Sequence, residues 1–218
     1  MSKPVLVIGA GGHAAVLVDI LRLLKRPILA IVSPNTELKR AIFENIKHLN
    51  HDDDILQYTP DEVELVNGIG SIPNGSKKEQ LRVKLYSSFK SKGYQFSNVI
   101  SPQAIISPFA TLAEGAQVMP NAVIQAGAFI GENSIINTSV VIEHDCQIGA
   151  HNHIAPGVII SGDVNIQDHV HIGTGVSIIQ GINIQKNSIV GAGATITKDV
   201  LADTITHPAR NFVKGKTV

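Results

Sequence analysis

Aliphatic residues recur at every sixth position through the second half of the chain. From Ile100 to Ile196, seventeen consecutive positions of this series hold Ile, Leu or Val. A second series lies four residues after the first and runs from Ala104 to Val200. It holds mostly small or β-branched residues, and Asn152 is its one plainly polar member. A period of six fits neither an α-helix nor an ordinary strand. It predicts a β-solenoid in which six residues form one side of a coil and about 18 residues form a coil.

Glycine often follows the aliphatic position, as at Gly131, Gly149, Gly173 and Gly191. We expect these glycines to form tight turns at the corners of the coils, because glycine has the backbone freedom that such turns favour.

The first part of the chain alternates short apolar runs with helical patterns. The pattern predicts strands at residues 5–8, 28–32 and 64–69, and helices at 14–25 and 77–92, while residues 36–62 carry no clear period. Alternating strands and helices favour a small parallel α/β domain of Rossmann-like type. The change of period predicts two domains, residues 1–97 and residues 98–218.

Composition excludes several classes of protein. Eighteen Lys and Arg balance eighteen Asp and Glu, so no basic field favours nucleic acid. The apolar runs are far shorter than the ~20 residues of a membrane span, and a single cysteine, Cys146, excludes an intrachain disulfide. No aromatic residue occurs between Ile130 and Asn211, which suits the narrow interior of a solenoid. We expect a cytoplasmic protein without membrane or nucleic-acid partners.

Histidines gather in one part of the repeat, with five of the nine between residues 144 and 171. Folding the sequence at 18 residues puts His151 in phase with His169, and His153 in phase with His171. His144 stands alone in its phase, with Ala126 one coil before it and Gly162 one coil after it. Small neighbours on both sides leave room for a ligand beside the His144 imidazole, and Glu143 and Asp145 flank it with carboxylates. Histidine suits general base catalysis because its pKa lies near neutral pH.

A glycine turn follows the first predicted strand. Gly9-x-Gly11-x-x-Ala14 resembles a dinucleotide fingerprint, but Ser33-Pro34-Asn35 stands where the ribose-binding acidic residue is expected. The turn therefore favours phosphate or a hydroxyl-rich ligand over NAD.

The repeat resembles the hexapeptide-repeat acyltransferases, whose fold is a left-handed parallel β-helix assembled as a homotrimer. Together with the Gly-Ala-Gly-Gly-His-Ala turn and the stretch from Asn137 to Gly149, the chain is similar to the sialic-acid O-acetyltransferase and sugar N-acyltransferase family. That family includes enzymes of the bacillosamine pathway. The resemblance implies transfer of acetyl from acetyl-CoA, without a metal, to a UDP-linked 4-amino-sugar, at sites between subunits.

The resemblance also implies roles for individual residues. His144 is the implied base and Asp145 its helper, with Glu143 less favoured. The implied residues at the acetyl-CoA site are His153, Gly162, Thr174 and Ala192. The implied substrate-binding residues are Gly11, Gly12, His13, Gly70, Ser71, Asn74 and Asn137.

Three alternatives stay open at this point. The motif does not distinguish an amine acceptor from a hydroxyl acceptor. O-acetylation of sialic acid or a related sugar is therefore the first alternative to N-acetylation. The stacked pairs His151-x-His153 and His169-x-His171 also suit a metal such as Zn²⁺. A scaffold without catalytic activity is the third.

Overall fold

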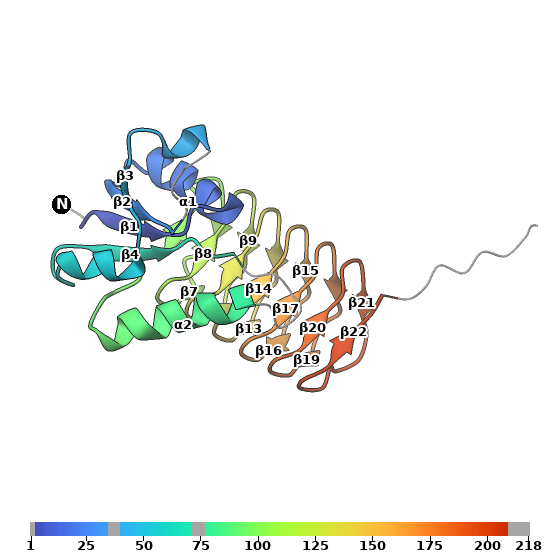
Figure 1. Ribbon diagram of the computed structural model, residues 1–218. Coiled ribbons are helices and arrows are strands. Elements are labelled where there is room, and N and C mark those ends of the chain that lie inside the picture. Colours follow the sequence, from blue (N-terminus) through green and yellow to red (C-terminus); the bar gives the residue numbers. More distant parts are fainter. Residues whose placement is uncertain (1–2, 35–39, 71–76, 209–218) are drawn as a thin grey trace, which may run out of the picture.

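The computed structural model describes residues 3–34, 40–70 and 77–208. Figure 1 shows a small α/β unit at one end of a long stack of coils, with α2 lying alongside the first of them. No helix among the described residues is long and apolar enough to cross a membrane. The predicted division at residue 97 stays a prediction, although the first strand of the stack begins two residues later, at Val99.

The N-terminal unit is built on a four-stranded parallel sheet with strand order β3-β2-β1-β4. Helix α1 begins two residues earlier than predicted, so that His13 lies in its first turn and not in the preceding loop. Residues 36–62, which have no clear pattern in the sequence, include a short edge strand and two 3₁₀ helices among those described. The elements of this unit are β1 (Val5–Ile8), α1 (Gly12–Leu23), β2 (Ile28–Val32), η1 (Ala41–Phe43), β3 (Lys47–Leu49), η2 (Asp52–Gln57), β4 (Glu64–Asn67) and α2 (Lys77–Ser91).

The remaining strands form a three-sided coil of two-residue strands, and the three sheets are named here faces I, II and III. Face I contains β5 (Val99–Ile100), β8 (Gln117–Val118), β11 (Ile135–Ile136), β14 (His153–Ile154), β17 (His171–Ile172), β20 (Ile189–Val190) and β22 (Ile205–Thr206). Face II contains β6 (Ile105–Ile106), β9 (Val123–Ile124), β12 (Val141–Ile142), β15 (Ile159–Ile160), β18 (Ser177–Ile178) and β21 (Thr195–Ile196). Face III contains β7 (Thr111–Leu112), β10 (Phe129–Ile130), β13 (Gln147–Ile148), β16 (Asn165–Ile166) and β19 (Asn183–Ile184).

The predicted register is confirmed. Strands pair in parallel with the strand 18 residues away, as Ile142 does with Ile160 and His153 with His171. The aliphatic residue of each six is the second residue of its strand and packs into one continuous core with the second series. The first residue of each strand points outward, since neighbouring side chains of a strand face opposite sides. The first residues of the strands therefore determine which side chains lie on the outer surface of each face.

The turn residues at the corners were predicted wrongly. Gly131 and Gly173 do not have positive φ; they are glycines because a Cβ at either would lie within about 2.6 Å of backbone in the next coil. Positive φ occurs instead three residues after the aliphatic position of each six-residue unit, in fourteen successive units from Gly115 to Gly193. Gly, Asn and Asp fill most of these positions because they tolerate the left-handed region best.

Buried polar contacts join the α/β unit to the coils. The Arg82 guanidinium of α2 donates to the carbonyls of Asn67, Ile69 and Asn133 at 2.7–3.0 Å. The Gln117 amide nitrogen donates to the carbonyl of Asn67 at 2.8 Å. These bonds fix the end of β4 and its glycine turn against face I.

Candidate active site

His144 and Asp145 lie at the corner between faces II and III, directly after β12. Nδ1 of His144 lies 2.8 Å from Oδ2 of Asp145, and 65% of the His144 side-chain surface is exposed. Asp145 occupies the left-handed corner position with φ of 62°. This conformation is one that Asp tolerates better than most residues, and it places the carboxylate beside the neighbouring imidazole.

Two glycines make room for this pair. A Cβ at Gly162, one coil after His144, would lie 2.6 Å from Nε2 and Cε1 of the imidazole. A Cβ at Gly127, one coil before Asp145, would overlap the Asp145 carboxylate. The predicted closeness of His144 and Gly162 is confirmed, and the ring edge that carries Nε2 lies over the Gly162 backbone.

The surroundings favour the protonated form of His144. The hydrogen bond to Asp145 raises the pKa of His144, and the negative charges of Asp145, Glu143 and Asp163 raise it further. A carboxylate that accepts from Nδ1 leaves the lone pair of the neutral ring on Nε2. The corner thus presents an imidazole whose lone-pair nitrogen faces Gly162.

A second set of predicted residues meets on face I. His153, Thr174 and Ala192 line one groove of about 320 Å³, together with His171 and Gly191. The His153 and His171 rings are stacked, with centroids 4.7 Å apart. The groove runs along successive coils, and its glycines allow a ligand to approach the backbone.

The groove histidines are neutral near pH 7, because their pKa values are shifted downward whereas that of His144 is shifted upward. Burial lowers the pKa of His153 to about 3, and repulsion from Arg82, and from His171 and His13 in their protonated forms, adds to this. Burial alone lowers the pKa of His171 to about 4. Nδ1 of each ring is buried without a hydrogen-bond partner, whereas Nε2 of His153 accepts from the Asn137 amide at 3.2 Å.

The predicted substrate-binding residues are divided between this groove and the glycine turn. Asn137 lies beside His153, as described above. Gly70 packs against His13, because a Cβ at Gly70 would lie 3.3 Å from that of His13. Gly11 and Gly12 are exposed at the start of α1. Ser71 and Asn74 lie outside the described residues.

Within one chain the two sets of residues stand apart. His144 and Gly162 lie at the corner between faces II and III, while the groove of His153, Thr174 and Ala192 lies on face I and its border with face II. The two sets also fall at different phases of the 18-residue register, because His144 and Gly162 share one phase whereas Thr174 and Ala192 share another.

Sequence reasoning missed three residues at these sites. Gln117 accepts a hydrogen bond from His13 at 2.7 Å, and the buried Arg82 shares the Asn67 carbonyl with Gln117. No motif marks either residue, since both act across the junction of two units. Gly127 had a signal, because it stands 18 residues before Asp145 in the register.

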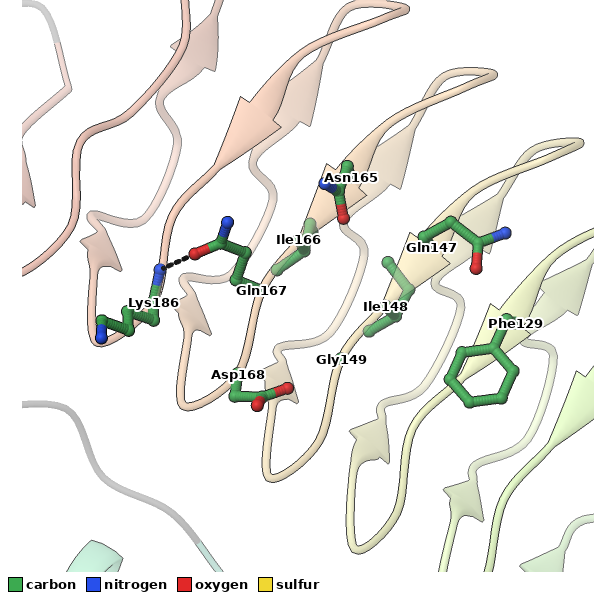
Figure 2. A pocket seen from close by; sticks show the side chains of 9 residues that line it. All are labelled: Phe129, Gln147, Ile148, Gly149, Asn165, Ile166, Gln167, Asp168 and Lys186. Atoms are coloured by element: carbon green, nitrogen blue, oxygen red, sulfur yellow. Dashed lines mark hydrogen bonds between the residues drawn. The ribbon is translucent and has the colours of Figure 1, made fainter.

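A second hollow, of about 340 Å³, lies on face III and contains none of the predicted residues. Figure 2 shows Phe129, Gln147 and Asn165 on successive strands of this face, with Gln167 bonded to the Lys186 backbone. Among the described residues no group of three or more His, Cys, Asp or Glu is placed to hold a metal ion.

Sequence comparison matches three segments to family models. Residues 4–85 match the PglD N-terminal domain, residues 127–162 match the bacterial transferase hexapeptide (six repeats), and residues 163–198 match the hexapeptide repeat of succinyl-transferase. No curated protein matches the chain significantly.

Solved structures match nearly the whole chain. A histidine-to-alanine variant of GDP-perosamine N-acetyltransferase from Caulobacter crescentus, in complex with CoA and GDP-perosamine, is 31% identical over 99% of both chains, with a TM-score of 0.82. The acetyltransferase domain of PglB from Neisseria gonorrhoeae, in complex with acetyl coenzyme A, is 26% identical over 97% of this chain and 100% of that chain, with a TM-score of 0.85. WeeI from Acinetobacter baumannii is 26% identical over 94% and 96%, with a TM-score of 0.79.

These matches cover both the α/β unit and the coils, which form a left-handed parallel β-helix. The chain belongs to the hexapeptide-repeat sugar acyltransferases, and it is an acetyltransferase that uses acetyl-CoA.

Proposed function

We propose that this protein is an N-acetyltransferase that transfers acetyl from acetyl-CoA to the amine of a nucleotide-linked 4-amino-sugar, with His144 as general base. The observation that carries the proposal is the His144–Asp145 pair, with its lone-pair nitrogen over Gly162. The two relatives solved with CoA or acetyl-CoA support the class of reaction.

The proposed transfer is direct. The amine nitrogen of the sugar attacks the thioester carbon, and Nε2 of neutral His144 accepts the proton that the nitrogen loses. The tetrahedral intermediate collapses, the C–S bond breaks, and CoA leaves as a thiolate that takes up a proton. Asp145 orients the imidazole and stabilises its protonated form during the step.

Acetyl-CoA is proposed to lie in the groove of His153, Thr174 and Ala192. His153 keeps one ring nitrogen without a partner, and we assign it the thioester carbonyl. The backbone N–H of Gly162 makes no hydrogen bond to the described residues, so it also remains available to the thioester. Donors held ready in this way stabilise the charge that develops on the oxygen.

The separation of the two sets of residues supports sites shared between subunits of a homotrimer. Face II presents an apolar column of outward side chains on four successive coils, Ile105, Val123, Val141 and Ile159, of which Ile105 is 67% and Ile159 is 48% exposed. Packing of face II around a threefold axis buries this column. It also brings the II–III corner of one subunit, with His144, toward the groove at the I–II border of the next.

The substrate is proposed to be UDP-linked, as the family resemblance implies, and to bind at Gly11, Gly12, His13, Gly70, Ser71, Asn74 and Asn137. Support comes from the match of residues 4–85 to the PglD N-terminal domain. The Caulobacter relative was solved with GDP-perosamine, so a GDP-linked amino sugar is the direct competitor.

The test is a turnover screen with acetyl-CoA against UDP-linked and GDP-linked 4-amino-sugars and free sialic acids, with release of CoA and the mass of the product as readouts. We expect an N-acetylated nucleotide sugar, with kcat/KM at least tenfold higher for the UDP-linked acceptor. Turnover of free sialic acids alone overturns the proposal, and a preference for GDP overturns the choice of nucleotide.

A further inference from the structure

Gln117 determines which nitrogen of His13 carries the proton. Its amide nitrogen lies 2.8 Å from the carbonyl oxygen of Asn67, which only accepts hydrogen bonds. The amide nitrogen must therefore face Asn67, and the amide oxygen must face His13. This oxygen lies 2.7 Å from Nε2 of His13, so Nε2 is the nitrogen that donates. Gln117 is buried at 1% exposure, which leaves its amide no alternative orientation in solvent.

The other ring nitrogen of His13 is left as a hydrogen-bond acceptor. Burial, together with the nearby positive charge of Arg82, lowers the pKa of His13 to about 4, so the ring is neutral near pH 7. No hydrogen bond within the described residues engages Nδ1, and the ring is only partly buried. Gly70 packs beside the ring without a side chain that would cover it.

A neutral acceptor selects the chemistry of its ligand. Nδ1 accepts a bond from a hydroxyl or an amine N–H, whereas it has no hydrogen to give to a phosphate oxygen. His13 therefore differs from the backbone N–H groups at the start of α1, which favour anions.

The position of His13 indicates the sugar as the part of the substrate that supplies this donor. Gln117 is on β8 of face I, two strands along from His153 on β14. Because His13 is bonded to Gln117, it lies against the same face of the coils that carries His153. The sugar must reach the acetyl group beside His153, whereas the base of the nucleotide lies at the far end of the substrate.

We propose that Gln117 is a positioning residue: it holds His13 with the proton on Nε2, so that Nδ1 accepts a hydrogen bond from a hydroxyl or amine of the sugar in the nucleotide-linked substrate. This inference rests on the proposed function. A residue of the coils, Gln117, then contributes to sugar binding indirectly, because it orients His13 of the α/β unit.

The first test is nitrogen NMR of histidine-labelled full-length protein without ligand, with His13 assigned from a His13→Gln variant. We expect a single neutral tautomer with hydrogen on Nε2 at pH 7. Gln117→Glu places a carboxylate against Nε2, and we expect a protonated His13 ring at the same pH. A wild-type ring with hydrogen on Nδ1, or one already protonated at pH 7, overturns the inference.

The second test is calorimetry with the UDP-linked 4-amino-sugar and with UDP alone. Protonation turns Nδ1 from acceptor into donor, so we expect Gln117→Glu to weaken binding of the nucleotide sugar at least tenfold. Binding of UDP and of acetyl-CoA should stay within twofold. Gln147→Glu is the matched control, because Gln147 is the first residue of β13 and is exposed on face III, and it should change nothing.

Three results of the second test overturn the inference: unchanged binding of the nucleotide sugar, an equal loss for UDP, or an equal effect of the control. If Gln117→Glu does not fold, Gln117→Met removes the same bond while the Asn67 carbonyl keeps Arg82 as a donor; the same selective loss is then expected, of about fivefold. A protein that binds no nucleotide sugar overturns both proposals, whereas intact binding without turnover overturns only the proposed function.

Discussion

The corner with His144 and the groove with His153 use the same residue type in opposite ways. His144 is exposed, bonded to a carboxylate and surrounded by negative charge, and its pKa is raised. His153 is mostly buried, stacked on a second imidazole and near the Arg82 guanidinium, and its pKa falls to about 3. One repeat therefore provides a ring that takes a proton and a ring that stays neutral.

Position within the six-residue unit, together with the face on which it falls, explains the difference. His144 stands two residues after the aliphatic Ile142, at a corner where the chain turns outward. His153 stands directly before Ile154, so its side chain points outward from face I, where its ring stacks on that of His171 in the next strand. Register and face together decide how much water reaches each imidazole, since Asn165 has the strand position of His153 but is exposed on face III. Desolvation then decides which form of the ring is stable.

The largest effect is expected from His144→Asn. Removal of the base should lower kcat about a hundredfold to ten-thousandfold, while the oligomer stays intact. His169→Asn is the matched control, because His169 is a corner residue at positive φ, where Asn is well tolerated. Steady-state assays and light scattering measure both. Turnover of His144→Asn near that of the control removes His144 as the base.

His153→Ala should have the next largest effect. Loss of one donor to the thioester oxygen is expected to lower kcat about a hundredfold. The KM for the sugar nucleotide should change little, because His153 is assigned to acetyl-CoA. Asn165→Ala, at the equivalent strand position on exposed face III, serves as the control. If both variants keep wild-type turnover, the groove does not hold the acetyl group.

Asp145→Asn should have a smaller effect that depends on pH. His144 must be neutral to act, so kcat/KM rises with pH through its raised pKa. Without the carboxylate that pKa falls, so the acid limb of the profile moves to lower pH and the plateau drops roughly tenfold as the base weakens. Asparagine keeps the left-handed corner conformation.

Asp163→Asn distinguishes the effect of the Asp145 hydrogen bond on the pKa of His144 from the effect of a more distant negative charge. Asp163 occupies the same corner one coil later and contributes only through its charge. Removal of the Asp163 charge should shift the acid limb of the kcat/KM profile much less than Asp145→Asn does. Equal shifts from the two variants show that Asp145 acts as a charge alone.

The coils could be predicted in detail because one residue in six repeats its environment. The aliphatic series gave the strands, the 18-residue pairing and the closeness of His144 to Gly162. The corner conformation was missed, because the sequence shows glycines without showing which are needed for φ and which for close packing between coils. Gly131 is of the second kind, Gly157 is of the first, and Gly127 is needed for both reasons.

The α/β unit was less predictable because its contacts are not periodic. Arg82 and Gln117 lie 35 residues apart in sequence, yet both bond to the Asn67 carbonyl. Such contacts depend on how β4, α2 and β8 pack together. No local pattern in the sequence contains that information.

The central claim is that His144 of one subunit acts on acetyl-CoA held beside His153 of another, and mixed oligomers test it most directly. His144→Asn and His153→Ala chains, each inactive alone, are unfolded together, refolded in equal amounts and assayed. In a trimer with shared sites every mixed assembly contains one intact site of three, so random mixing should restore about a quarter of wild-type activity. Mixtures as inactive as the two parent variants would contradict the claim.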